Sequence, residues 1–178
     1  NLKSQISNHK EMAIDLLKRA GWFVVFVLVQ AVVLGRIHLF ICATPLFYVY
    51  FVTQFPRNYP KWGILLWSFM LGVMIDTFSN TPGLASASLT MIAAIQPYYF
   101  ELFVPRDSVD DLKPALSTIG PLKYSYYIIT LVLLYCLMFF SLELFTYFNW
   151  VQWALCVGGS TAITLMLIFT FESAKLNR

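Results

Sequence analysis

Lysines and arginines fall almost entirely between the long apolar runs of this chain rather than inside them. The chain is 59% hydrophobic and only 12% charged, whereas soluble domains are about half apolar and about a quarter charged. A helix needs about 20 apolar residues to cross a bilayer core about 30 Å thick, and several runs approach that length. The sequence therefore predicts an all-α, polytopic membrane protein.

Six apolar runs can be delimited by turn residues and charges. The segment Asn80–Gly83 separates the third run from the fourth, Gln96 and Pro97 end the fourth, and Val104–Lys123 forms the longest connection. Proline and glycine clusters of this kind are typical of chain turns. The six predicted transmembrane helices cover about residues 21–34, 37–55, 62–78, 84–95, 124–145 and 150–171.

The cations also predict an orientation, because cytoplasmic loops of membrane proteins are enriched in lysine and arginine. With both termini in the cytoplasm, only Arg36 lies on the outer side. We expect a cytoplasmic segment over 1–19, a six-helix domain over 20–173 and a cytoplasmic tail over 174–178, and we interpret Met12 as the native start, with 1–11 upstream of it. The predicted cytoplasmic cations are Lys3, Lys10, Lys18, Arg19, Arg57, Lys61, Arg106, Lys113, Lys123, Lys175 and Arg178.

Pro45 interrupts the second apolar run and allows two interpretations. In the first, Thr44 caps a helix that begins at Pro45, and Ile37–Ala43 is a separate, re-entrant piece. In the second, one kinked helix continues through the proline. Residues from Pro45 to Phe55 would reach only about 16 Å as a helix, which is too short to span a membrane alone.

Asp76 is the most informative single side chain. A carboxylate inside a membrane costs a few kcal/mol when it is deep, and the last turn of a helix is unfavourable for it because the macrodipole is negative there. Some compensation is expected, and Arg36 is the first candidate because it is the only cation on the outer side. Thr77, Ser79 and Thr81 can add hydrogen bonds. A structural role, a partner or ligand contact, and catalysis all remain open for Asp76.

Small and amide side chains predict how the helices pack. Ala154, Gly158 and Ala162 are spaced four apart on the last run, and small residues let helix backbones approach closely in lipid. Packing within the bundle and contact with a partner protein are both consistent with that spacing. Gln30 and Gln96 are predicted to form hydrogen bonds between helices.

No sequence motif supports catalysis, a cofactor or a metal site. The chain has no HExxH and no phosphate-binding GxxxxGK, and His9 and His38 are far apart, without a cluster of further ligands. Intramembrane carboxylates do not form the series that a proton relay requires. The sequence therefore favours a non-enzymatic membrane protein that binds a protein or a small molecule, and not nucleic acid.

The middle of the chain resembles a known family. The stretch from Ala43 to Tyr50, with Thr44-Pro45, is followed by Phe69-x-x-Gly72-x-x-x-Asp76-x-Phe78-Ser79-Asn80-Thr81-Pro82-Gly83. This pattern is similar to the MreD family of rod shape-determining proteins, in the form found in Bacteroidetes-type bacteria, and the resemblance extends over about Met12–Phe171. Pro45, Gly72, Asp76, Pro82 and Gly83 match the family pattern. Gln96 departs from it, because related proteins often have a basic residue there.

The resemblance implies a subunit of the cell-elongation machinery in the bacterial inner membrane. Such proteins associate with an MreC subunit, with MreB filaments and with the RodA–penicillin-binding-protein synthase. Their fold is similar to that of the substrate-binding S components of energy-coupling-factor transporters. We therefore expect a scaffold that docks an MreC-like partner, with Arg36, Asp76, Gln96 and Pro97 among the candidate structural or contact residues. The alternative is an S component that holds a vitamin-like ligand.

Overall fold

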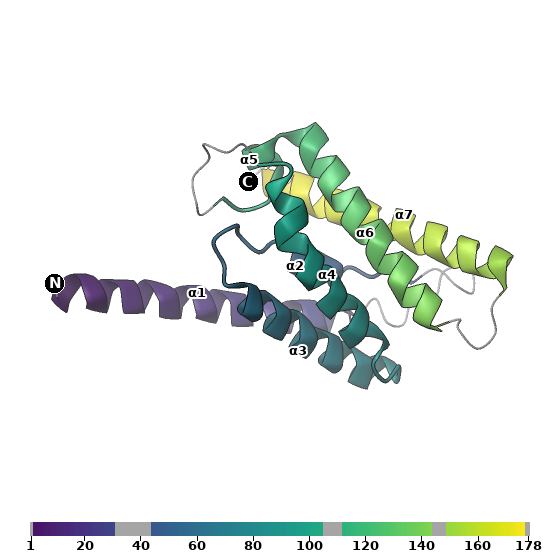
Figure 1. The fold of residues 1–178 in the computed structure, drawn as a ribbon, viewed down its shortest axis with the longest axis horizontal. Coiled ribbons are helices and arrows are strands. Elements are labelled where there is room, and N and C mark those ends of the chain that lie inside the picture. Colours follow the sequence, from purple (N-terminus) through teal and green to yellow (C-terminus); the bar gives the residue numbers. More distant parts are fainter. Residues whose placement is uncertain (1, 31–43, 105–111, 144–148, 177–178) are drawn as a thin grey trace.

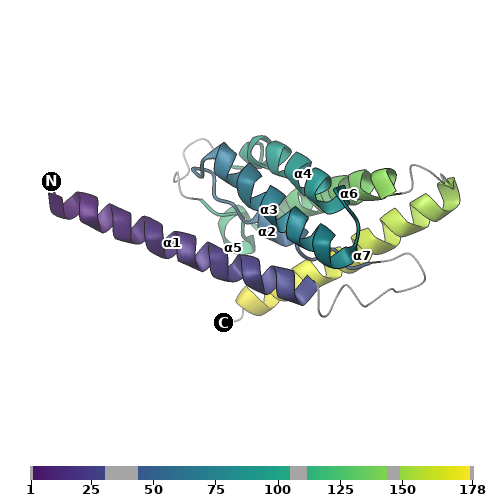
Figure 2. The same cartoon turned by 90° about the horizontal axis from the view of Figure 1, so that it is seen from below.

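The computed structural model describes residues 2–30, 44–104, 112–143 and 149–176, and in these ranges every regular element is a helix. The α3 and α4 helices form one antiparallel pair, and α6 and α7 form a second (Figure 1). The α1 helix packs beside α2 and α3, and its N-terminal part extends well beyond the other helices (Figure 2). The elements are α1 (Leu2–Leu28), α2 (Val49–Thr53), α3 (Lys61–Ser79), α4 (Leu84–Glu101), α5 (Leu116–Ile119), α6 (Pro121–Glu143) and α7 (Trp150–Leu176).

Three of these helices are long and apolar enough to cross a membrane, namely α3, α6 and α7 over Lys61–Ser79, Pro121–Glu143 and Trp150–Lys175. They coincide with the third, fifth and sixth predicted runs, so the prediction of a helical membrane protein is confirmed at this level. The α4 helix is as long as a short span, but serine, threonine and glutamine lower its hydropathy. The polar lead-in and the first apolar run, as far as Leu28, form one continuous helix, α1, rather than two elements.

The second apolar run does not form the helix expected of it. Residues 44–46 are non-helical, and the helix that follows, α2, is only five residues long and fully buried. Both interpretations of Pro45, as the first residue of a helix and as a kink within one, are therefore wrong. The predicted re-entrant piece, Ile37–Ala43, lies outside the described residues.

Side chains of other helices satisfy the backbone of this non-helical segment. The Thr44 N–H donates to the Ser160 hydroxyl (3.1 Å) and the Leu46 N–H donates to Thr164 Oγ1 (3.0 Å). The Gln30 amide donates to the Pro45 carbonyl (3.0 Å). Irregular backbone is tolerated at membrane depth only where protein or water meets its polar groups, and here α1 and α7 provide those partners.

The α4 helix continues past Pro97, so the prediction that Gln96 and Pro97 end this helix is wrong. It extends to Glu101 with Pro97 inside it. A proline removes one backbone donor and crowds the preceding turn, but membrane helices accept this when neighbouring helices hold the segment. The predicted long connection that follows contains the short helix α5.

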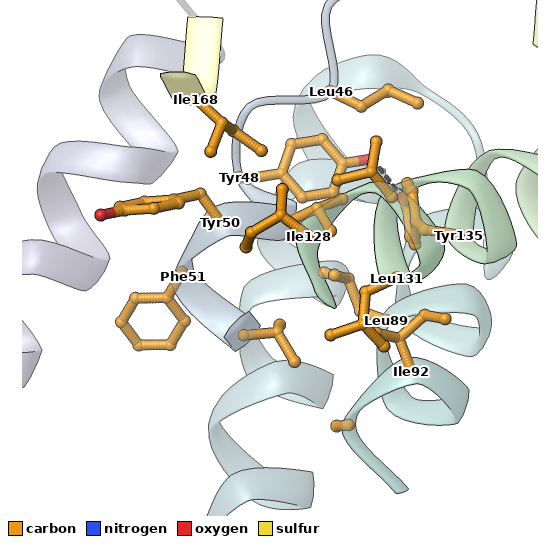
Figure 3. Packing of buried hydrophobic residues seen from close by; sticks show 14 of the residues in the cluster. Leu46, Tyr48, Tyr50, Phe51, Leu89, Ile92, Ile128, Leu131, Tyr135 and Ile168 are labelled. Atoms are coloured by element: carbon orange, nitrogen blue, oxygen red, sulfur yellow. Dashed lines mark hydrogen bonds between the residues drawn. The ribbon is translucent and has the colours of Figure 1, made fainter. Parts of the chain in front are cut away.

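Aromatic and branched side chains fill the centre of the bundle (Figure 3). The Tyr48 and Tyr135 hydroxyl groups form a hydrogen bond there, and both side chains are buried. Leu89 of α4 and Leu131 of α6 pack beneath them. The α2 helix thus lies inside the bundle, enclosed by helices that can contact lipid.

A candidate docking face on the α3–α4 hairpin

The carboxylate of Asp76 caps the first turn of α4. One of its oxygens accepts a hydrogen bond from the Ala85 N–H (2.8 Å) and the other accepts one from the Ser86 N–H (2.9 Å). The Thr81 hydroxyl adds a third, weaker contact at 3.2 Å. Gly83 occupies the N-cap position of α4 and has no side chain to offer, so a residue at the end of α3 performs the capping that the local sequence lacks.

The sequence predicted that the Asp76 carboxylate needs a favourable partner inside the membrane. The first turn of α4 is that partner in the structure. The positive end of the α4 macrodipole faces the carboxylate, which offsets the unfavourable C-terminal end of α3. Of the predicted helpers, Thr81 contacts Asp76, whereas the Thr77 hydroxyl donates to the Val73 carbonyl of its own helix. Arg36, the expected partner, lies outside the described residues.

The turn between α3 and α4 is built around two left-handed backbone positions. Asn80 has φ 54° and Gly83 has φ 86°, a region that asparagine and glycine adopt more readily than other residues. The Asp76 carbonyl accepts hydrogen bonds from the Asn80 and Thr81 N–H groups. Asp76 therefore closes α3 with its backbone and opens α4 with its side chain. Pro82 lies exposed in the turn between them.

Gly72, one helical turn before Asp76, lets the two backbones touch. A Cβ atom at this position would lie 2.3 Å from the Ser86 Cα and 2.6 Å from the Ser86 nitrogen. No larger residue fits unless the helices separate. Gly72 and Asp76 therefore act on the same point of α4, and with Gly83 they shape the structure that we call the hairpin (residues 61–101).

The outward surface of the hairpin carries two hollows that meet at Ser86, which together we call the outer groove. One has a volume of about 490 Å³ and the other a volume of about 400 Å³. Bulky α3 side chains form one wall, and the floor on α4 consists mainly of small ones. The lining residues are Leu65, Phe69, Val73, Asp76, Thr77, Asn80, Pro82, Gly83, Ser86, Ala87, Thr90, Met91 and Ala94.

Gln96 lies inside the bundle, away from the outer groove. Its side chain is 1% exposed, and its amide donates to the Tyr127 hydroxyl (3.0 Å) and, at 3.4 Å, to the Phe55 carbonyl. Tyr127 in turn donates to the Thr53 carbonyl (3.1 Å). The predicted hydrogen bond between helices is thus confirmed for Gln96, which joins α4 to α6, whereas Gln30 donates to the carbonyl of the non-helical Pro45. A direct partner contact at Gln96 does not fit its burial.

The small-residue stripe of α7 faces away from the rest of the described structure. Ala154, Gly158 and Ala162 are exposed, and a Cβ atom on Gly158 would meet nothing within 4 Å. Of the two alternatives for this stripe, packing within the bundle is therefore not seen in the described part of the chain, and contact with a partner stays a prediction. The opposite face turns inward because it carries Ser160 and Thr164, which meet the backbone of residues 44–46.

Sequence reasoning missed a second buried carboxylate. Glu172 of α7 is 3% exposed, accepts a hydrogen bond from the Tyr50 hydroxyl, and lies 3.9 Å from the Lys175 ammonium group. Glu172 follows directly after the last predicted span, where a charged side chain is expected to be exposed to solvent. The spacing of Glu172 and Lys175, three residues apart on one helix, was the available signal for an ion pair.

Comparison with models of known protein families, with curated proteins and with solved structures finds no match for this chain. Within the described ranges, the structure brings no group of three histidine, cysteine, aspartate or glutamate side chains together as metal ligands. The groove geometry is therefore the main structural guide to function.

Proposed function

We propose that this protein is an MreD-like, non-enzymatic subunit of the bacterial cell-elongation complex. It docks an MreC-like partner in the inner membrane and helps to position peptidoglycan synthesis by the RodA–penicillin-binding-protein synthase along MreB filaments. One observation carries the proposal: Gly72, Asp76 and Gly83, three of the five residues of the family resemblance, fix the hairpin. The resemblance thus includes residues that have a structural role in the hairpin and does not depend on hydropathy alone.

The outer groove is the proposed docking site for a single membrane helix of the partner. Small residues mark helix–helix contacts in membranes because they let backbones approach, and Ala87, Thr90 and Ala94 form the floor of the groove. Phe69 of α3 is 48% exposed and Met91 of α4 is 45% exposed, so large apolar side chains flank that floor. A helix with bulky side chains complements such a surface, and the capped hairpin presents it without rearrangement.

The distribution of charge supports an orientation with both termini in the cytoplasm. From Lys18 onward, every lysine and arginine in the described ranges lies near the end of the bundle where α3 and α6 begin and α4 and α7 end (Figure 1). We call this the basic end, and the N-terminal part of α1 projects beyond it (Figure 2). Cytoplasmic loops are enriched in these residues. The proposed six crossings add α1, the segment through α2, and α4 to the three candidate spans.

The transporter alternative is less well supported by the site geometry. Substrate sites in transporters lie where broken helices leave backbone groups free for a ligand. Here the non-helical residues 44–46 have their polar groups taken by Gln30, Ser160 and Thr164. Native mass spectrometry of the gently purified protein separates the two functions, because an S component retains a small molecule and an MreD-like subunit retains an MreC-like chain.

Two substitutions in the groove test the docking site. Ala87→Phe and Ala94→Phe fill the floor without touching the core, and we expect each to abolish co-purification of the MreC-like chain while leaving the melting temperature nearly unchanged. Gly158→Phe is the matched control, because it adds the same ring to the other exposed small-residue surface. Loss of the partner with Gly158→Phe alone would move the docking site to α7, and no MreC-like chain with the unmodified protein would refute the function.

A further inference from the structure

The described charges of this protein are separated between its two ends. The basic end carries Lys18, Arg19, Arg57, Lys61, Lys113, Lys123 and Lys175. Among the carboxylates whose side chains the structure describes, the exposed Glu101 and the buried Glu172, which is already paired with Lys175, lie near them, and Asp15 precedes Lys18 by three residues on α1. At the opposite end, the described charges are Asp76 and Glu143. The described surface of the basic end is therefore strongly cationic.

Aromatic rings hold two of these cations in place. The Arg19 guanidinium carbon lies 4.3 Å from the centroid of the Tyr59 ring and 5.0 Å from that of Phe55. The Lys61 ammonium nitrogen lies 4.1 Å above the ring of Tyr98. The Trp67 indole N–H donates to the Tyr59 hydroxyl (3.1 Å), which fixes that ring. Cation–π contacts of this kind hold a cation over the face of an aromatic ring.

The same end exposes a belt of amphipathic aromatic side chains. Trp62 is 70% exposed, Tyr98 61% and Tyr126 66%. Tryptophan and tyrosine are enriched at the depth of lipid headgroups. Trp62 is adjacent to Lys61, and Tyr98 contacts it, so this cation lies at the depth where phosphate groups of the bilayer are found.

We propose that the basic end binds anionic phospholipid headgroups, with Arg57 and Lys61, at the start of α3, as the centre of the binding surface. Arg57 lies in the turn that precedes α3, and Lys61 is the first residue of this helix. Lys61 makes no ion pair within the described part of the chain. Each cation near an anionic leaflet strengthens binding by about fivefold. This surface is separate from the outer groove, so lipid binding to it can be measured independently of partner docking.

Native mass spectrometry of the full chain in detergent, titrated with phosphatidylglycerol or phosphatidylcholine of identical acyl chains, tests the proposal. We expect phosphatidylglycerol to be retained at least about 25-fold more tightly than phosphatidylcholine, because two cations contribute about fivefold each. The double variant Arg57→Gln, Lys61→Gln should lose about 25-fold in phosphatidylglycerol affinity, from two cations at about fivefold each, with phosphatidylcholine unchanged. The charge-preserving double variant Arg57→Lys, Lys61→Arg should retain the preference.

Three outcomes would overturn the proposal. These are equal retention of the two lipids, displacement of phosphatidylglycerol by equimolar inorganic phosphate, and the same loss in the charge-preserving variant as in the glutamine variant. A salt titration of the unmodified protein provides a second test that needs no variant to fold. Raising sodium chloride from about 50 mM to about 500 mM should weaken phosphatidylglycerol binding and spare phosphatidylcholine, because salt screens exposed charges.

Discussion

The α3–α4 hairpin and the α6–α7 pair are both antiparallel helix pairs, but they are fixed by different means. In the hairpin, backbones touch at Gly72, and Asp76 caps a helix that begins only eight residues later, at Leu84. The α7 helix, in contrast, is fixed by side chains that reach segments more than a hundred residues away, through Ser160, Thr164 and Glu172. The first region is specified locally, and the second depends on the rest of the fold.

The largest loss of stability is expected from adding a side chain at Gly72. Gly72→Ala places a Cβ atom against the Ser86 backbone and should lower the free energy of unfolding by about 3 kcal/mol, because two backbones must separate. The melting temperature in detergent should fall by roughly 10 °C. Gly158→Ala, on the open face of α7, is the control and should be neutral or stabilising by up to about 1 kcal/mol. Equal effects at both glycines would show that the hairpin contact is not tight.

The second-largest loss of stability is expected from altering Asp76, whose carboxylate caps α4. Asp76→Asn replaces a carboxylate oxygen by an NH₂ group that faces the α4 backbone donors, so one hydrogen bond is lost and a donor is left opposed to a donor. We expect a loss of about 2–3 kcal/mol. Glu101→Gln, on an exposed site of the same hairpin, should change the melting temperature little. If Asp76→Asn is as mild as Glu101→Gln, then Asp76 does not stabilise the start of α4.

A smaller effect is expected where α7 meets α2. Tyr50→Phe removes the hydroxyl donor from the buried Glu172 carboxylate and should cost about 2 kcal/mol. Tyr126→Phe is the control, because the Tyr126 side chain is 66% exposed, and removal of its hydroxyl should cost about 0 kcal/mol. Thermal unfolding of the two variants side by side gives the difference. A larger loss of stability in the control variant than in Tyr50→Phe would contradict the described role of Tyr50.

The smallest effect is expected at the non-helical segment. Thr164→Val keeps the side-chain shape but leaves the Leu46 N–H unpaired, at a cost of about 1–2 kcal/mol. Thr170→Val is the control, because this exposed hydroxyl donates only to the Met166 carbonyl of its own helix. Because the hairpin and α7 share no partner in these contacts, Thr164→Val combined with Asp76→Asn should be additive within about 0.5 kcal/mol. Strong coupling between the two would mean that the regions are not independent.

The contrast between the locally specified hairpin and α7, which depends on distant segments, explains which features could be predicted from the sequence. Apolar runs and the Asn80–Gly83 turn are local signals, and they located α3, α6, α7 and the hairpin turn. The need for compensation at Asp76 was also visible, but the donor was an α4 backbone terminus, which no residue type marks. The path of residues 44–46 depended on Ser160 and Thr164, and only the folded structure brings these side chains to them. For the same reason, the spacing of Ala154, Gly158 and Ala162 could not decide between packing within the bundle and contact with a partner.

The most direct test of the account is site-specific photo-crosslinking in native membranes from Met91, which lines the outer groove. Leu133 of α6, which is 40% exposed where Met91 is 45% exposed, is the control position. The account predicts one discrete crosslinked product with an MreC-like chain from position 91 and none from position 133. Crosslinks to that chain from position 133 alone, or only to lipid from position 91, would contradict a docking site on the hairpin.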